Sequence, residues 1–145
     1  MRALENLKPL SLLLLRVALG VVFIFHGYPK ILGDPKSWVV AFGHMGFPAY
    51  FAYIAGVLEF FGGILLVLGL FTRVAALLLA IEMGIALVKV HIPLAGLHFS
   101  SIGKYELPLA LCGGAFALAT VGAGLISVDN FTFEGARRAP KKNKP

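Results

Sequence analysis

The sequence predicts an all-α integral membrane protein, a four-helix bundle with both termini in the cytoplasm, and three observations support this prediction. Of the 145 residues, 59% are hydrophobic and 14% are charged, whereas soluble domains are about half apolar and one quarter charged. Four apolar runs each reach the length of about 20 residues that a membrane-spanning helix needs. The basic residues gather on one side of these runs. A soluble globular domain is therefore excluded.

The four apolar runs cover about residues 10–32, 50–70, 74–92 and 107–126, and none alternates as a barrel strand does. The first run resembles a signal peptide, but Arg16 interrupts it and no small-residue cleavage site follows. We therefore expect a retained span. The turn of about three residues between the second and third runs forces an antiparallel hairpin. Because no repeat or linker divides the chain, we expect one domain over residues 1–145.

Residues at spacings of four and three predict which faces of the spans pack together. One such stripe runs through the first span at Arg16, Gly20, Phe23, Gly27 and Lys30. Small residues recur at this spacing in the fourth span at Ala110, Gly113, Ala117, Thr120 and Gly124. Because small residues let helix backbones approach closely in lipid, we expect both stripes to face other helices.

The distribution of Lys and Arg predicts the orientation of the spans. The N-terminus, the turn at Arg73 and the C-terminal tail hold eight basic residues, against four on the other side if Lys89 is counted. The positive-inside rule then places both ends in the cytoplasm and the loops over residues 33–49 and 93–106 outside. The tail at 134–145 holds five of the eight and fits a segment near anionic lipid headgroups. No aromatic residues are interleaved with these bases, so we expect membrane lipids as partners and no nucleic acid.

Three ionisable residues, Arg16, Glu59 and Glu82, lie inside the predicted spans. A charge at the centre of a bilayer costs about 3 kcal/mol, so such residues face the protein interior and have partners. Because their depths overlap, we expect Arg16 to pair with Glu59, with Glu82 close enough to couple to the pair. Two carboxylates around one guanidinium leave a surplus negative charge, so one carboxylate can hold a proton. The alternative is a buried charge network that only fixes the register of the helices.

The outer ends of the spans hold a second group of polar residues, which fits a quinone. A quinone ring needs a donor or proton source at its carbonyls and an aromatic or apolar wall. The candidate ligand-binding residues are His26, Lys30, Trp38, His91 and Glu106. We expect His26, Lys30 and Glu106 to approach one another, with His91 nearby. Three alternatives stay open: Lys30 extends to the outer interface, Trp38 belongs to an interfacial aromatic belt, or the two histidines hold a b-type haem.

Cysteine usage restricts the redox chemistry of the chain. Cys112 is the one cysteine, which excludes an intramolecular disulfide, a dithiol motif and a covalent haem attachment motif. No Cys and His cluster has the spacing of a zinc site. We therefore expect no metal and no covalent cofactor. A redox role would have to borrow a cofactor or a partner, and the sequence leaves open whether the chain is an enzyme.

Four motifs together resemble the DoxX family of small four-span membrane proteins, over nearly the whole chain. They read Arg16-x3-Gly20-x5-His26-Gly27-x2-Lys30 in the first span, Glu59-x2-Gly62-Gly63 running into Leu68-Gly69-Leu70-x-Thr72-Arg73 after the second, Met83 and Ala86 in the third, and Glu106 with Gly122-x-Gly124-x2-Ser127-x-Asp129 around the fourth. Ala123 stands where the closing motif would have a proline, and Glu82 is an addition to the family pattern.

The resemblance implies a four-helix bundle in the bacterial cytoplasmic membrane and, for some members, a link to oxidoreductase complexes such as quinone-linked thiosulfate oxidation. It also extends to a eukaryotic cargo-receptor family of related fold, so activity does not follow from the fold. Three functions fit the sequence. The first is a small subunit of a quinone-linked redox complex. The second is a non-catalytic subunit that associates with other membrane proteins, and the third is a small-solute or proton pathway.

Overall fold

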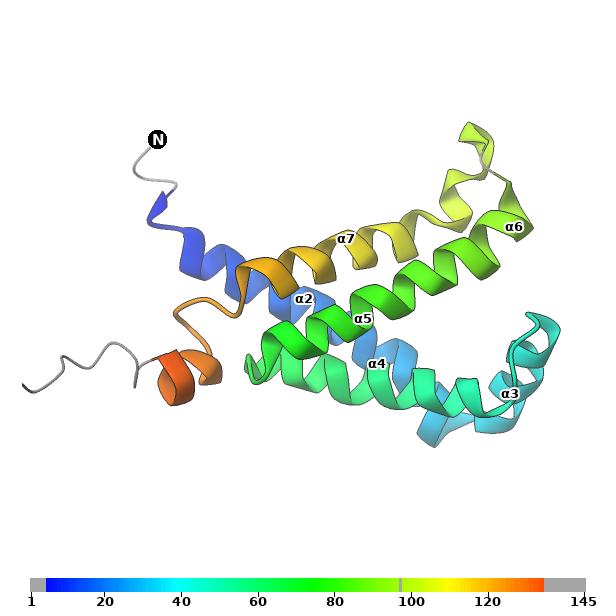
Figure 1. Ribbon diagram of the computed structural model, residues 1–145, viewed down its shortest axis with the longest axis horizontal. Helices are drawn as coiled ribbons and strands as arrows, with labels where there is room; N and C mark the ends of the chain where they lie inside the picture. Colours follow the sequence, from blue (N-terminus) through cyan, green and yellow to red (C-terminus); the bar gives the residue numbers. More distant parts are fainter. Residues whose placement is uncertain (1–4, 97, 135–145) are drawn as a thin grey trace, which may run out of the picture.

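The computed structural model describes residues 5–96 and 98–134 and confirms an all-α membrane bundle (Figure 1). Within the described residues there is no strand. The main helices are α2 (Lys8–Tyr28), α4 (Tyr50–Leu68), α5 (Thr72–Ala86) and α7 (Glu106–Val121), and the shorter ones are α3 (Pro35–His44) and α6 (Ile92–Ala95). Three continuous stretches, Lys8–Gly33, Tyr50–Leu68 and Thr72–Leu94, are long and apolar enough to span a membrane.

The fourth helix is shorter than the sequence predicts. Helix α7 has 16 residues and ends at Val121, whereas the apolar run continues to about residue 126. Gly122 and Gly124 have positive φ angles of 95° and 79°, and this left-handed backbone, which glycine adopts without strain, breaks the helix. The basic tail predicted at 134–145 lies outside the described residues apart from Glu134.

The bundle consists of two closely packed helix pairs, α2 with α4 and α5 with α7, joined mainly through α4 and α5. The α4–α5 turn lies at the same end as the start of α2 and the segment after α7, which we call the turn end (Figure 1). Helices α3 and α6 lie at the opposite end, which we call the α3 end. At the turn, Gly69 ends α4 with a φ of 71°.

The predicted stripe on the first span is confirmed, because all five of its residues are buried. A Cβ added to Gly20 would lie 2.6 Å from the carbonyl oxygen of Gly63, so only glycine permits this approach of α2 to α4. The stripe predicted on the fourth span is wrong. Helix α7 buries Leu111, Ala115 and Leu118 instead.

Helix α3 folds the loop between α2 and α4 back over the α3 end of the bundle. Asp34 caps its first turn, because its carboxylate accepts hydrogen bonds from the Ser37 hydroxyl at 2.6 Å and the Ser37 amide at 3.4 Å. These bonds hold the pKa of Asp34 below its usual value. The rings of Phe42 and Phe47 lie 5.9 Å apart. The loop therefore has a fixed helix that positions aromatic side chains.

Candidate functional site

Lys30 and Glu59 form an ion pair in the interior of the bundle. Their exposed fractions are 7% and 3%, so the pair is withdrawn from both lipid and water. Lys30 lies in the π-helical turn Pro29–Gly33 that continues α2, and Glu59 lies in the middle of α4. A Cβ added to Gly56 would lie 2.8 Å from the Lys30 Cβ. The missing side chain of Gly56 therefore lets the lysine approach α4.

Aromatic rings from α3 flank the Lys30 ammonium. Its Nζ lies 5.2 Å from the centre of the Trp38 ring and 6.0 Å from the centre of the Phe42 ring. Both distances fall within the range of cation–π attraction. Lys30 does not extend to the interface, which was one alternative that the sequence left open. The ammonium is held between a carboxylate on one helix and two rings on another.

The prediction that Arg16 pairs with Glu59 is wrong. Arg16 is 1% exposed, but its Nη2 donates to the carbonyl of Ile126 at the turn end, where Asp129 interacts with it electrostatically. Side chains of a helix lean toward its N-terminus. Helix α2 begins at the turn end, so the side chains of Arg16 and Lys30 both lean toward that end. This lean carries Arg16 away from Glu59 and brings Lys30 toward Glu59.

Half-buried Glu82 on α5 joins the buried residues Lys30 and Glu59, and we call these three residues the buried charge cluster. Glu82 interacts electrostatically with both other members. Its Oε2 atom is buried and has no hydrogen-bond partner among the described residues. His26, whose side chain is exposed, also lies within electrostatic range of Glu59. The cluster thus has two carboxylates for one ammonium, the same surplus of negative charge that the sequence predicted around Arg16.

The structure divides the predicted ligand-binding residues between two places. Lys30 and Trp38 lie together, with His26 near their partner Glu59. His91 instead lies 3.0 Å, through its Nδ1, from the carbonyl oxygen of Lys104. Glu106 is exposed at the start of α7. The expected approach of Glu106 to His26 and Lys30 is therefore not seen, because α7 packs mainly on α5 while these two residues belong to the α2–α4 pair.

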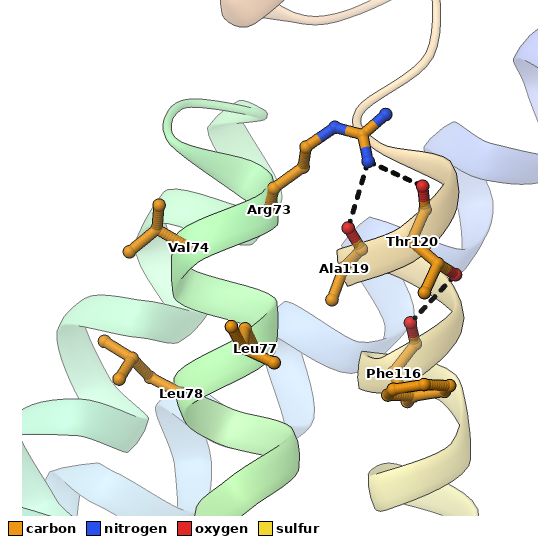
Figure 2. A pocket seen from close by; sticks show the side chains of 7 residues that line it. All are labelled: Arg73, Val74, Leu77, Leu78, Phe116, Ala119 and Thr120. Atoms are coloured by element: carbon orange, nitrogen blue, oxygen red, sulfur yellow. Dashed lines mark hydrogen bonds between the residues drawn. The ribbon is translucent and has the colours of Figure 1, made fainter.

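At the turn end, the start of α5 and the segment at and after the end of α7 are connected by helix caps. Sequence reasoning did not predict these caps. The Asp129 carboxylate accepts hydrogen bonds from the backbone amides of Phe71 at 2.7 Å and Thr72 at 2.9 Å, at the start of α5. In return, Arg73 of α5 donates to the last carbonyls of α7, those of Ala119 and Thr120 (Figure 2) and that of Val121. Their charges were the available signal, because a carboxylate such as Asp129 is favourable at the start of a helix and a guanidinium such as Arg73 is favourable at the end of one.

The sequence pattern of the DoxX family matches residues 11–92. The chain belongs to the DoxX family. The matched residues include all three members of the buried charge cluster. This DoxX protein is thus a membrane protein whose interior charges lie within the region that defines its family. No solved structure matches the chain significantly.

Relatives of this DoxX protein are similar to it beyond the residues that the family pattern matches. An uncharacterized protein of Haemophilus influenzae is 38% identical in an alignment of 137 residues that covers 92% of this chain and 99% of that protein. "Putative oxidoreductase CatD" of Bacillus subtilis is 32% identical, over 86% of this chain and 89% of that protein. Inner membrane protein YphA of Escherichia coli is 33% identical, over 84% of this chain and 90% of that protein.

Proposed function

We propose that this DoxX protein is a small subunit of a quinone-linked redox complex in the bacterial inner membrane. The observation that carries the proposal is the Lys30–Glu59 ion pair beneath the rings of Trp38 and Phe42. Two relatives support it by their names, since CatD carries the word oxidoreductase and YphA is an inner membrane protein. The proposal includes both termini in the cytoplasm, the orientation that the distribution of basic residues predicts.

The residues of this site fit a quinone ring. The Lys30 ammonium has three N–H donors, of which Glu59 takes one. A further donor is available for a ring carbonyl, and Trp38 and Phe42 supply the flat apolar wall. When bound, a quinone accepts electrons and protons at its carbonyl oxygens. Lys30 would orient such a carbonyl, and Glu59 and Glu82 would hold protons beside it, with electrons supplied by a partner subunit that carries a redox cofactor.

Quantifying quinone in purified protein tests the proposal. The protein is purified from bacterial membranes in mild detergent, and organic extracts are assayed for quinone against protein. We expect near-stoichiometric quinone in the parent and at least a roughly tenfold loss in Lys30→Met, since removing a buried hydrogen bond to a charged group is worth about 1.5–3 kcal/mol. Lys89→Met is the matched control, because Lys89 is exposed and lies outside the site. Absence of quinone from the parent, or equal amounts in Lys30→Met, would refute the proposal.

A proton pathway is the second candidate, because the Oε2 atom of Glu82 is buried and has no hydrogen-bond partner in the part of the chain that the structure describes. Intramembrane carboxylates that face a bundle interior are typical of proton relays. Liposomes that hold the protein and a pH-sensitive dye test this function. Proton flux in the parent that Glu82→Gln abolishes would favour the pathway. Flux no greater than that of empty liposomes would exclude it.

A further inference from the structure

An apolar groove runs between α5 and α7 at the turn end of the bundle. It encloses about 280 Å³ and is lined by Val74, Leu77 and Leu78 from α5 and by Phe116 and Ala119 from α7. Figure 2 shows these side chains along the two helices, with Arg73 at the end of the groove where α5 begins. Arg73 thus marks the mouth of the groove, which lies at the beginning of the membrane-spanning stretch Thr72–Leu94.

Arg73 places a positive charge at this mouth. Its guanidinium has five N–H donors, and three hydrogen bonds to the carbonyls at the end of α7 use Nη1 and Nη2. The Nε–H has no partner among the described residues. Within them, no carboxylate lies within ion-pair distance of Arg73, since the one salt bridge there joins Lys30 to Glu59.

Gly122, the residue after α7, packs against this part of the guanidinium and has no side chain to cover it. A Cβ added to Gly122 would lie 3.0 Å from Nη2 and 3.1 Å from Nε. Because glycine has no side chain, the space beside these two nitrogen atoms is not filled by the residue that follows α7. Nε and Nη2 form the edge through which arginine binds phosphate with two parallel hydrogen bonds.

We propose that the groove binds an anionic phospholipid, whose phosphate pairs with Arg73 and whose acyl chain lies between α5 and α7. The proposal goes beyond the quinone function and is independent of it. The remaining lining residue, Thr120, agrees with a hydrocarbon occupant. Its hydroxyl donates to carbonyls of its own helix, at 2.9 Å to Ala117 and 3.1 Å to Phe116, and so requires no polar partner from the groove.

Native mass spectrometry of the delipidated protein tests the proposal with phosphatidylglycerol and phosphatidylcholine that carry the same acyl chains. One Lys or Arg near an anionic lipid surface is worth about 1 kcal/mol, which corresponds to about fivefold tighter binding of phosphatidylglycerol. We expect Arg73→Gln to abolish this preference, because glutamine retains a donor for the carbonyls of α7 without the charge. Lys89→Gln removes an exposed cation from the other end of the same helical stretch and should leave the preference unchanged.

A second variant tests the groove without touching Arg73. Ala119→Trp fills the apolar part and should weaken the binding of both lipids, even if Arg73→Gln does not fold. Soluble glycerol phosphate, which has the anion without the acyl chain, should not compete. Equal binding of the two lipids by the parent, unchanged binding in Ala119→Trp, or competition by glycerol phosphate would each overturn the proposal.

Discussion

Replacing Lys30 with methionine should destabilise the protein by about 3–5 kcal/mol, because removing one partner of a buried ion pair strands the other charge. Glu59 would be the stranded group, at 3% exposure. Since small domains are stable by about 5–15 kcal/mol in total, the loss is a large fraction of the folding free energy. The double variant Lys30→Met with Glu59→Met should recover most of it, because apolar residues of similar volume replace a buried pair at little net cost.

A double-mutant cycle on the purified protein measures this coupling. Unfolding is followed by circular dichroism as sodium dodecyl sulfate is added to mixed micelles, and the four free energies give the interaction between the two sites. We expect a coupling of about 3 kcal/mol or more for Lys30 with Glu59, because each single variant strands a buried charge and the double variant strands none. The matched cycle of Arg16→Met with Glu59→Met should be additive within about 0.5 kcal/mol, because these residues are not in contact. Coupling in the second cycle and additivity in the first would refute the assignment of partners.

Three further outcomes are expected from the same unfolding assay or from fluorescence. Asp129→Ala removes the cap of α5 and should cost about 0.5–2 kcal/mol, whereas no change would mean that the cap is dispensable. Gly27→Val, against the backbone of α4, should cost about 1–3 kcal/mol or more. In Gly113→Ala the added Cβ meets no other described element within 4 Å, so this control should be neutral or stabilising by up to ~1 kcal/mol. Because the pKa of Asp34 is lowered, its cap stabilises α3 at neutral pH and is lost as the pH falls through that pKa. Emission from Trp38, the single tryptophan, should shift in acid in the parent and not in Asp34→Asn.

The sequence was sufficient to predict the first three spans from their apolar length. It also predicted the buried face of the first helix, because the pattern on α2 combined small and charged residues. Neither type of residue is favourable against lipid. The fourth helix carries no charge between Leu107 and Val121. Large apolar side chains are as well accommodated by lipid as by protein, so hydrophobicity did not determine which face packs. Small residues alone then predicted the wrong face, and Leu111 and Leu118 fill the interior.

The partner of Glu59 could not be predicted from depth alone. Counting residues from the ends of the spans made the depths of Arg16 and Glu59 overlap. The packing of α2 on α4 instead places Arg16 beside Gly69, ten residues along the chain from Glu59. The glycine at position 56, three residues before Glu59, was a usable signal, because it marks where a neighbouring helix approaches α4. The caps at the turn end depend on where α7 stops, and the apolar run past Val121 concealed that end.

Because α7 is short, the hydrophobic thickness of the protein is smaller on the α7 side than beside the longer helices. Its 16 residues span about 24 Å, whereas the 23 residues of Thr72–Leu94 span about 34 Å. The hydrocarbon layer is about 30 Å thick, so α7 is too short by several ångströms, and thinning the bilayer beside it costs a fraction of a kcal/mol per ångström. This hydrophobic mismatch favours thin membranes, and it favours a neighbouring protein with an equally short helix on the α7 side over bulk lipid.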